Sequence, residues 1–515
     1  MRITNSMIMN NTASNMNTNK TKVDELNTQM STQKKINRPS DDPVIAIRAL
    51  RLRSSLSEID QYYEKNIPDA ESWLAATETA LKNMQEIITD IYRQCVNGAT
   101  DTLNQKDRDT ILVSLQNMRD QIYSEGNADY AGRTVFTGYK TNKTLTFQED
   151  TPNISYNITQ KFSYNDITQK NYYTGYSEVP TTDDLTAGTL PSTNMEEHTY
   201  HRLRLEYDSL GDITQLQYKD AGGNLQDIDG MQINYIDEAT GNAQTANVTF
   251  VERHYTDWEN AYNFEVGDNE VVYVPESGEI LFGKNVAAHM SSEKPEMVVS
   301  YNKTGFSKGE LRPEHYFDCT DTTDLNPDNH IKYVKENQEI NYMVAFNQTL
   351  AVNTQASDVF DSGMQRDVDE LTDAVQMAIR AHEKVDKIDA MMKEEKYASE
   401  ESQALLQKWK DTAQKEADYA DRNMKNLYSE GISKYQGYLT DVTLARTEVG
   451  NKGSSLALTK SRMSNQQMTF EKLKSTNEDK ELSDVIIEYT AAYTAYQSSM
   501  QAASKAIKQT LLDYI

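Results

Sequence analysis

The chain is short of cysteine, proline, glycine and long apolar runs. Of its 515 residues, 2 are cysteine, 10 are proline and 21 are glycine. Two cysteines, Cys95 and Cys319, cannot build a disulfide framework, and so little proline and glycine excludes a collagen-like or Pro/Gly-rich low-complexity chain. No run approaches the roughly 20 apolar residues of a membrane-spanning helix. Residues 1–7 contain no apolar signal-peptide core. We therefore expect neither a membrane anchor nor a cleaved signal peptide.

Positive charge is also scarce, and the imbalance is local. The net charge is −27, from 52 basic and 79 acidic side chains. Residues 150–361 hold 35 acidic and 13 basic side chains, whereas the remaining residues are almost balanced. An acidic chain disfavours nucleic acid and anionic membranes as partners. Nearly neutral flanks around a strongly charged middle predict flanks that associate and a middle that faces water.

The N-terminal third is predicted to be helical. Residues 1–36 are rich in Asn and Thr, yet apolar residues recur there every seven positions at Met9, Met16, Val23 and Met30. Leu26, Thr12, Asn19 and Gln33 complete a thin heptad seam, which buries too little to fold without a partner. The segment 40–43 reads as a helix cap with proline in the first turn. It is followed by predicted helices over 44–63, 69–96 and 107–124, with an interruption at 66–68.

The C-terminal part shows longer heptads. Residues 428, 435, 442, 449, 456, 463 and 470 are apolar or aromatic at intervals of seven. Near the end of the chain, two series lie four residues apart and together predict an a/d seam. The first series is Ile486, Tyr493, Met500, Ile507 and Tyr514, and the second is Leu482, Tyr489, Tyr496, Ala503 and Thr510.

The middle block is predicted to be mostly β. Short apolar runs such as 271–274 and 280–282 flank the turn signal at 276–279, and similar short strands are expected at 135–139 and 144–147. Residues 155–161 nearly recur as 163–170, which we interpret as a duplicated hairpin or loop because the copies are far below solenoid size.

We therefore expect an elongated α+β protein in which the terminal helices pair into a coiled-coil rod around a mostly β centre. Pattern alone equally allows terminal helices that merely pack on an α+β core. The predicted segments are an inner helix over 1–40, a helical rod over 41–131 and 362–480, a β domain over 132–361 and a C-terminal inner helix over 481–515.

Two histidine motifs are candidates for zinc binding. His198 and His201 lie three residues apart, but their stretch reads as strand or loop rather than as a helix that would present both on one face. His382-Glu383 begins like a zinc-protease motif, yet Asp386 stands where the second histidine is required. We interpret both as exposed polar surface.

Nothing else in the sequence points to catalysis. Asp318, Asp321, Asp324 and Asp328 lack calcium-loop spacing and its glycine. The sequence contains neither a Gly-rich phosphate loop nor a nucleophile elbow. Cys95 lies in a predicted helix, where buried packing is expected. We expect no enzyme activity, no catalytic residue, no metal and no cofactor.

Three spaced motifs carry a family resemblance. Residues 38–43, RPSDDP, follow an Asn/Thr-rich helix and resemble the flagellin superfamily, with a closer likeness to hook–filament junction proteins than to filament flagellins. Residues 132–141, GRTVFTGYKT, resemble the family's exit from its helical domain, and residues 510–515, TLLDYI, resemble its C-terminal ending. The resemblance covers about 1–149 and 430–515.

The resemblance implies a structural adaptor of the bacterial flagellum at the hook–filament junction. Its implied partners are hook-associated protein 1, flagellin, further copies of itself in a ring-like layer, and a flagellar export chaperone. It also implies type III export, without a cleaved signal peptide, to an extracellular position on the flagellum. The alternatives are a filament flagellin and a flagellin-family protein whose central insert is adhesive or enzymatic.

The terminal heptads and one turn are the candidate functional residues. We expect subunit contacts from Met9, Met16, Val23, Met30, Leu482, Ile486, Tyr489, Tyr493, Tyr496, Met500, Ile507 and Tyr514. The turn between the inner and outer layers is expected at Asn37, Arg38, Pro39, Ser40, Asp41, Asp42 and Pro43.

Overall fold

The structure is a computed structural model that describes residues 5–100, 105–174, 177–191, 196–220, 222–236, 241–254 and 265–508. The contacts within the chain divide it into two compact units. Unit 1 draws on residues 1–71, 341–350 and 453–515, and unit 2 draws on 72–340 and 351–452. Each unit is described by itself.

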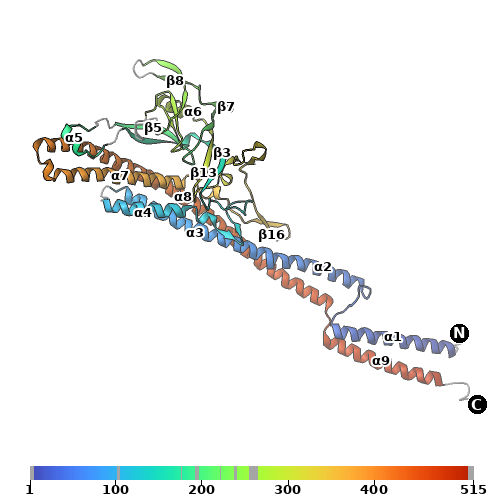
Figure 1. Ribbon diagram of the computed structural model, residues 1–515. Coiled ribbons are helices and arrows are strands. Elements are labelled where there is room, and N and C mark those ends of the chain that lie inside the picture. Colours follow the sequence, from blue (N-terminus) through green and yellow to red (C-terminus); the bar gives the residue numbers. More distant parts are fainter. Residues whose placement is uncertain are drawn as a thin grey trace, which may run out of the picture. The chain divides into compact units, whose positions relative to one another are not determined.

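Helices form both ends of the described chain (Figure 1). Their bounds are α1 (Asn5–Thr32), α2 (Pro43–Asp60), the π-helical η1 (Gln61–Asn66), α3 (Ile67–Gly98), α4 (Gln105–Ile122), α5 (Thr182–Ala187), α6 (Lys284–Glu293), α7 (Met364–Met392), α8 (Glu400–Glu478) and α9 (Leu482–Lys508). The boundary between the units falls within α3 and α8.

The expected interruption at 66–68 is not a break. The chain stays helical from α2 through η1 into α3, and the N–H of Ile67 bonds to the carbonyl of Tyr62, five residues back. Pro68 lacks an N–H, and its ring would clash with the carbonyl four residues earlier in a regular helix. The wider π turn accommodates that ring, so the proline signal marks a change of helix type.

The heptad predicted in the C-terminal part is confirmed in α8, a continuous helix of 79 residues. The side chains of Tyr428, Tyr435, Val442, Val449, Leu456 and Met463 are at most 3% exposed. Phe470, the last of the series, is half-buried. A strict seven-residue repeat of bulky residues thus keeps one face of this helix buried from Tyr428 to Met463.

The β part of unit 2 consists of two larger sheets and small strand pairs in the described ranges. The five-stranded sheet runs β10 (Thr249–Glu252), β11 (Glu270–Val274), β12 (Glu279–Phe282), β5 (Glu196–Arg204), β4 (Ile167–Thr174), and the six-stranded sheet runs β15 (Ile331–Tyr333), β14 (Asp318–Asp321), β3 (Thr151–Phe162), β13 (Met297–Phe306), β6 (Ile213–Lys219), β7 (Leu225–Asp227). The predicted hairpin around 276–279 is confirmed as β11–β12.

The remaining strands form pairs. These are β1 (Asp129–Tyr130) with β2 (Arg133–Thr134), β8 (Gln232–Ile236) with β9 (Ala243–Asn247), and β16 (Asn341–Ala345) with β17 (Gln348–Ala351). Residues 135–139 form bends and turns rather than the expected strand, and the stretch 144–147 contributes an isolated bridge, Thr146 to Leu311.

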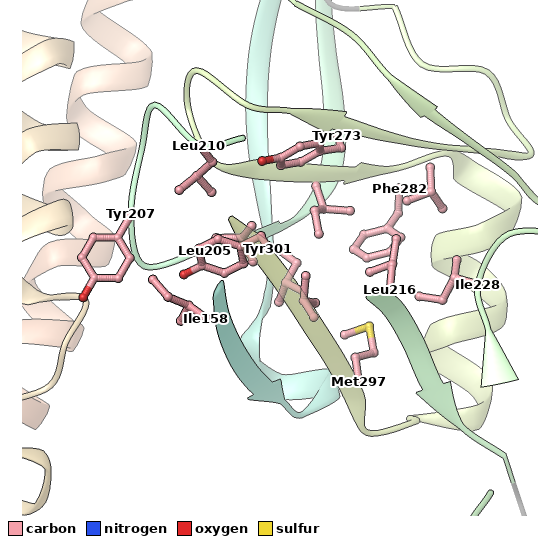
Figure 2. Close-up of a cluster of buried hydrophobic side chains, with 14 of the residues drawn as sticks. Ile158, Leu205, Tyr207, Leu210, Leu216, Ile228, Tyr273, Phe282, Met297 and Tyr301 are labelled. Carbon is pink, nitrogen blue, oxygen red and sulfur yellow. The ribbon is translucent and has the colours of Figure 1, made fainter. Parts of the chain in front are cut away.

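The two larger sheets share one hydrophobic core (Figure 2). Tyr301 and Met297 of β13 come from the six-stranded sheet, and Tyr273 and Phe282 come from the five-stranded sheet. The duplicated sequence was predicted to be a hairpin or loop, and the two copies do not pair with each other. Its first copy lies in β3. Its second copy begins with the 3-10 turn η3 (Tyr164–Asp166) and continues into β4, which belongs to the other sheet.

A buried charge network joins the five-stranded sheet to α7 within unit 2. Arg202 of β5 contacts Glu370 of α7 at 2.5 Å, and Arg204 contacts Asp367 at 2.6 Å and Glu370 at 3.0 Å. Burial alone would raise the pKa of the Glu370 carboxyl, but Arg202, Lys170 and Arg204 together hold it well below its usual value. A charge network this deeply buried demands one geometry, since a lost partner would leave an unpaired charge.

The predicted α+β class is confirmed, with helices before and after a mostly β central region. The predicted pairing of the two terminal helices is also confirmed, because α1 packs along α9 (Figure 1). None of the described helices combines the length and the apolarity that spanning a membrane requires.

Candidate assembly interface

Helix α1 presents one thin, mixed seam to α9. The residues of α1 that lose solvent exposure repeat every three or four positions, as a coiled-coil seam requires. They are Thr12, Met16, Asn19, Val23, Leu26, Gln29 and Met30, and among them Leu26 is 1% and Gln29 7% exposed. Met9 remains 45% exposed, and Gln33 lies beyond the end of α1 with a positive φ of 54°. The exposed positions of this helix carry mostly Asn, Thr and Ser side chains, with Met7, Ile8 and Met9 near its start and Lys20, Lys22, Asp24 and Glu25 further along.

Helix α9 packs against α1 with a seam of small and aromatic side chains. Its less exposed residues are Val485, Tyr489, Ala492, Tyr496, Ser499 and Ala503, spaced as a heptad. Only one of the two predicted series, Tyr489, Tyr496 and Ala503, faces α1. The other half of the seam consists of Val485, Ala492 and Ser499, which the sequence reasoning did not select because Ala and Ser are weak core signals.

Three residues of the first predicted series, Ile486, Tyr493 and Met500, form a separate apolar stripe on α9, and Leu482 of the second series joins it. Leu482, Ile486, Tyr493 and Met500 are 43%, 47%, 43% and 40% exposed. On a helix these positions lie beside the α1-facing seam, within about 100° of it. Ile507 lies in α9 by its backbone, whereas Tyr514 and Thr510 fall outside the described residues. Helix α9 therefore carries two apolar faces and uses one of them within the chain.

Two segments that are far apart in sequence cross between the helices side by side. The link from α1 to α2 and the link from α8 to α9 form an antiparallel bridge between Lys34 and Asp479. The N–H of Lys35 donates to the carbonyl of Glu478 at 2.7 Å, and the N–H of Lys480 donates to the carbonyl of Gln33 at 3.0 Å. We call this paired region, residues 33–36 and 478–481, the crossover.

Charged side chains fix the crossover. The carboxylate of Glu478 is 3% exposed and receives two hydrogen bonds from Arg53, while the ammonium of Lys34 lies 3.7 Å away and also pairs with Asp479. The hydrogen bonds from Arg53 lower the pKa of the Glu478 carboxyl. Lys480 pairs with Glu488 at the start of α9. The crossover is thus a folded joint held by both backbone and ion pairs.

The turn expected at 37–43 lies directly after the crossover. The side chain of Asp41 accepts hydrogen bonds from the N–H groups of Asn37 and Arg38, at 3.0 and 2.8 Å. The side chain of Asp42 caps α2 by accepting from the N–H groups of Val44 and Ile45, and Pro43 occupies the first helical turn. These caps explain why the chain needs this run of acidic residues and prolines.

Among the described residues, no group of three or more His, Cys, Asp or Glu side chains is arranged to hold a metal ion, at the two histidine motifs or elsewhere. His201 contacts Gln169 across the β4–β5 pair, and His198 stacks on Tyr200. His382 was expected to be exposed polar surface, but its Nε2 lies 2.9 Å from the carboxylate of Asp421. The same carboxylate pairs with Arg108. Both cysteines are buried, and burial raises the pKa of each thiol to about 12.

The comparisons with known proteins agree with the N-terminal motifs. The family model for the bacterial flagellin N-terminal helical region matches residues 3–141. Flagellar hook-associated protein 3 of Salmonella typhimurium is 32% identical over 148 residues, which cover 27% of this chain and 44% of the relative. The Escherichia coli protein of the same name is 35% identical over 129 residues, covering 24% of this chain and 38% of that relative. The matches thus span less than half the length of either relative.

Solved structures are similar at a lower level. A putative flagellar hook-associated protein from Vibrio parahaemolyticus has a TM-score of 0.34 and 14% identity, covering 85% of this chain and all of that chain. Hook-associated protein 3 from Legionella pneumophila has a TM-score of 0.29 and 8% identity, covering 82% and 97%. Scores of this size establish no common arrangement of the whole chain. The predicted resemblance to the flagellin superfamily is confirmed over residues 3–141 by the family model, and the resemblance to hook-associated protein 3 is confirmed by the two relatives.

Proposed function

We propose that this chain is a structural subunit of the bacterial flagellum that joins the hook side to the filament at the hook–filament junction. It acts by binding through its helical ends, without catalytic turnover. The observation that carries the proposal is the second apolar stripe on α9, residues Leu482, Ile486, Tyr493 and Met500, beside a seam that already holds α1. A helix with two apolar faces is suited to a bundle of more than one neighbour.

The charge pattern of the two helices supports packing in such a bundle. Residues 5–19 of α1 and 489–504 of α9 carry no charged side chain. Identical neutral helices can be brought together around an axis without like-charge repulsion, which a charged surface would impose. Further copies of this chain are therefore the first proposed partners, and hook-associated protein 1 and flagellin are proposed at the two sides of the layer. A flagellar export chaperone is proposed to cover the C-terminal helix before export.

Deletion of the gene tests the function. We expect cells to retain hooks but lose filaments, and to release flagellin into the medium. Intact filaments on the deletion strain would refute the junction role. Loss of the filament protein itself, without release of another flagellin, would favour the alternative of a filament flagellin.

The stripe is tested in the same strain by complementation. A variant with Ile486→Ser, Tyr493→Ser and Met500→Ser should keep the α1–α9 pair yet fail to restore filaments. Gln501→Ser, on an exposed polar position of the same helix, is the matched control and should restore them. If the triple variant complements normally, the stripe is not an assembly surface.

A further inference from the structure

One short hairpin of the middle region belongs to unit 1 rather than to unit 2. Strands β16 and β17 pair over residues 341–350, and these residues pack with the helices of unit 1 (Figure 1). Their contacts concentrate on the π-helical segment η1 and the first turn of α3. The hairpin is joined to α8 as well, because Gln348 contacts Thr459 and Arg462.

Asn66, the last residue of η1, links the hairpin to the π geometry. Its Nδ2 donates to the carbonyl of Met343 at 2.8 Å, and its Oδ1 accepts from Gln61 Nε2 at 3.0 Å. Gln61 and Asn66 are five residues apart. Such residues stack on one side of a π-helix, whereas in an α-helix they point about 140° apart. The two bonds of Asn66 can therefore coexist only while the π turn is present.

Two tyrosines complete the contact between the hairpin and the helix. Tyr342 of the hairpin donates to the carboxylate of Asp69 in α3, and the hydroxyl of Tyr62 in η1 lies 3.5 Å from the sulfur of Met343. Hairpin docking and the π form thus stabilise each other, and Pro68 favours the same form.

The surplus residue of the π turn sets the register of α2. If the segment became a regular α-helix while α3 stayed in place, each position along α2 would be taken by the next residue in sequence, a rotation of about 100°. The face of α2 that is now buried consists of Ala46, Ala49, Leu56 and Ile59, each 7–8% exposed. Ile47, Leu50, Ser57 and Asp60 would take those positions.

The surface of α2 fits this second register in part. Ile47 and Leu50 are 53% and 64% exposed now, and they would replace the smaller Ala46 and Ala49 in the buried face. At the other end of the helix, Ser57 and Asp60 would replace the buried Leu56 and Ile59. One half of the helix gains apolar burial and the other half loses it. The shift would also separate Arg53 from the buried carboxylate of Glu478, so the present register is favoured while the hairpin holds η1.

We propose that the β16–β17 hairpin is a clasp that holds η1 in its π form and thereby selects one of two packing registers of α2. This inference concerns the chain's own conformations and does not depend on the proposed junction role. A π turn that the hairpin and Pro68 together hold in place is a two-state element, which neighbours of the hairpin can bias.

The test is the labelling rate of single cysteines in the full-length chain. Leu50→Cys and Ala49→Cys report the two faces of α2, and the native Cys95 and Cys319 are 0% and 4% exposed and contribute a slow background. With the clasp intact, Leu50→Cys should react with a maleimide fast and Ala49→Cys slowly. Adding Asn66→Ala and Tyr342→Phe, and then also Pro68→Ala, should slow the first and speed the second by about tenfold.

A one-residue deletion supplies the control. The deletion removes the exposed Glu64 from the chain that carries Asn66→Ala, Tyr342→Phe and Pro68→Ala. Because the surplus residue is then gone, a regular α-helix places α2 in its present register without a π turn. The original labelling order should then be restored. If both cysteines become fast, the segment unfolds locally and the two-register proposal is wrong. Unchanged rates in the variant that also carries Pro68→Ala would overturn it as well.

Discussion

The guanidinium of Arg53 holds both carboxylate oxygens of Glu478, with Nε 2.8 Å from Oε1 and Nη2 2.6 Å from Oε2. This fork joins α2 to the last residue of α8, at the point where the chain turns into α9. Because the paired backbone of the crossover lies directly beside it, the ion pair connects the α2–α8 pair to the α1–α9 pair.

We predict that Glu478→Gln loosens the crossover. The amide keeps the shape but loses the charge, and hydrogen bonds to a charged group contribute about 1.5–3 kcal/mol. Hydrogen exchange at neutral pH should become faster at the backbone amides of Lys35 and Lys480. Glu471→Gln, on an exposed position of the same helix, should leave those rates unchanged. Equal acceleration in both variants would mean that the charge pair does not hold the joint.

The same pair predicts an acid sensitivity of unit 1. The hydrogen bonds from Arg53 lower the pKa of the Glu478 carboxyl below its ordinary value of 4.5. Since the folded pKa is the lower one, this contribution is fully present above about pH 4.5 and is lost as the pH falls through the folded value. The protection of the crossover amides, measured relative to their intrinsic exchange rates, should therefore fall on acidification below pH 4.5 in the wild type, and Glu478→Gln should remove that dependence. An unchanged acid response in the variant would contradict the assignment.

A close approach in unit 2 gives a packing prediction with an internal control. A Cβ added at Gly98, the last residue of α3, would lie 2.4 Å from the buried ring of Tyr428 in α8. A rigid aromatic ring cannot yield, so Gly98→Ala should destabilise the fold by about 1–3 kcal/mol. Gly437 of α8 has open space around it, and Gly437→Ala should stabilise by about 0.5–1 kcal/mol. Urea unfolding of the two variants should shift in opposite directions.

The carboxyl of Glu206 predicts a sensitivity in the alkaline direction. Burial raises its pKa to about 8, against a hydrogen bond from Ser362 that lowers it. Because the folded state binds the proton more tightly, stability is highest below about pH 4.5 and is lost as the pH rises towards 8, by about 3 kcal/mol at pH 7. Glu206→Gln stays neutral, so its unfolding midpoint should hold steady where the wild type declines between pH 5 and 8. Parallel pH profiles would rule out Glu206 as the source.

The long helices could be predicted because their signal is local and repeated. The seven-residue series of α8 specifies one buried face by itself, and the cap at Asp42 and Pro43 marks the start of α2. The seam of α9 could not be chosen from the sequence. Two apolar series lie side by side there, and the one that faces α1 is completed by Ala492 and Ser499, which allow close approach but carry little apolar signal.

Pairings between distant segments could not be predicted from the sequence, for a different reason. The bridge between Lys34 and Asp479 joins residues 445 apart through backbone groups, which carry no residue code. The attachment of the hairpin to Asn66 likewise ends on a backbone group, because the side chain of Asn66 donates to the carbonyl of Met343. For the duplicated segment, similarity of sequence predicted mutual pairing, but β3 and β4 belong to different sheets. Ile158 of β3 lies in the shared core, whereas Tyr172 of β4 packs in a separate cluster with Val272, Val274 and Leu281.

Truncation separates the role of the terminal helix from the stability of the middle region. Removing residues 483–515 takes away α9 and exposes the seam of α1, while the sandwich core of unit 2, which includes Tyr273 and Tyr301, makes no use of that helix. We expect the thermal transition of unit 2 to stay within a few degrees of the wild type. The helical signal of α1 should fall, because a seam of Thr12, Met16 and Asn19 buries too little to hold a lone helix. A lost or strongly lowered unit 2 transition would show that the terminal pair supports the β region, and that its heptads serve folding as well as contacts.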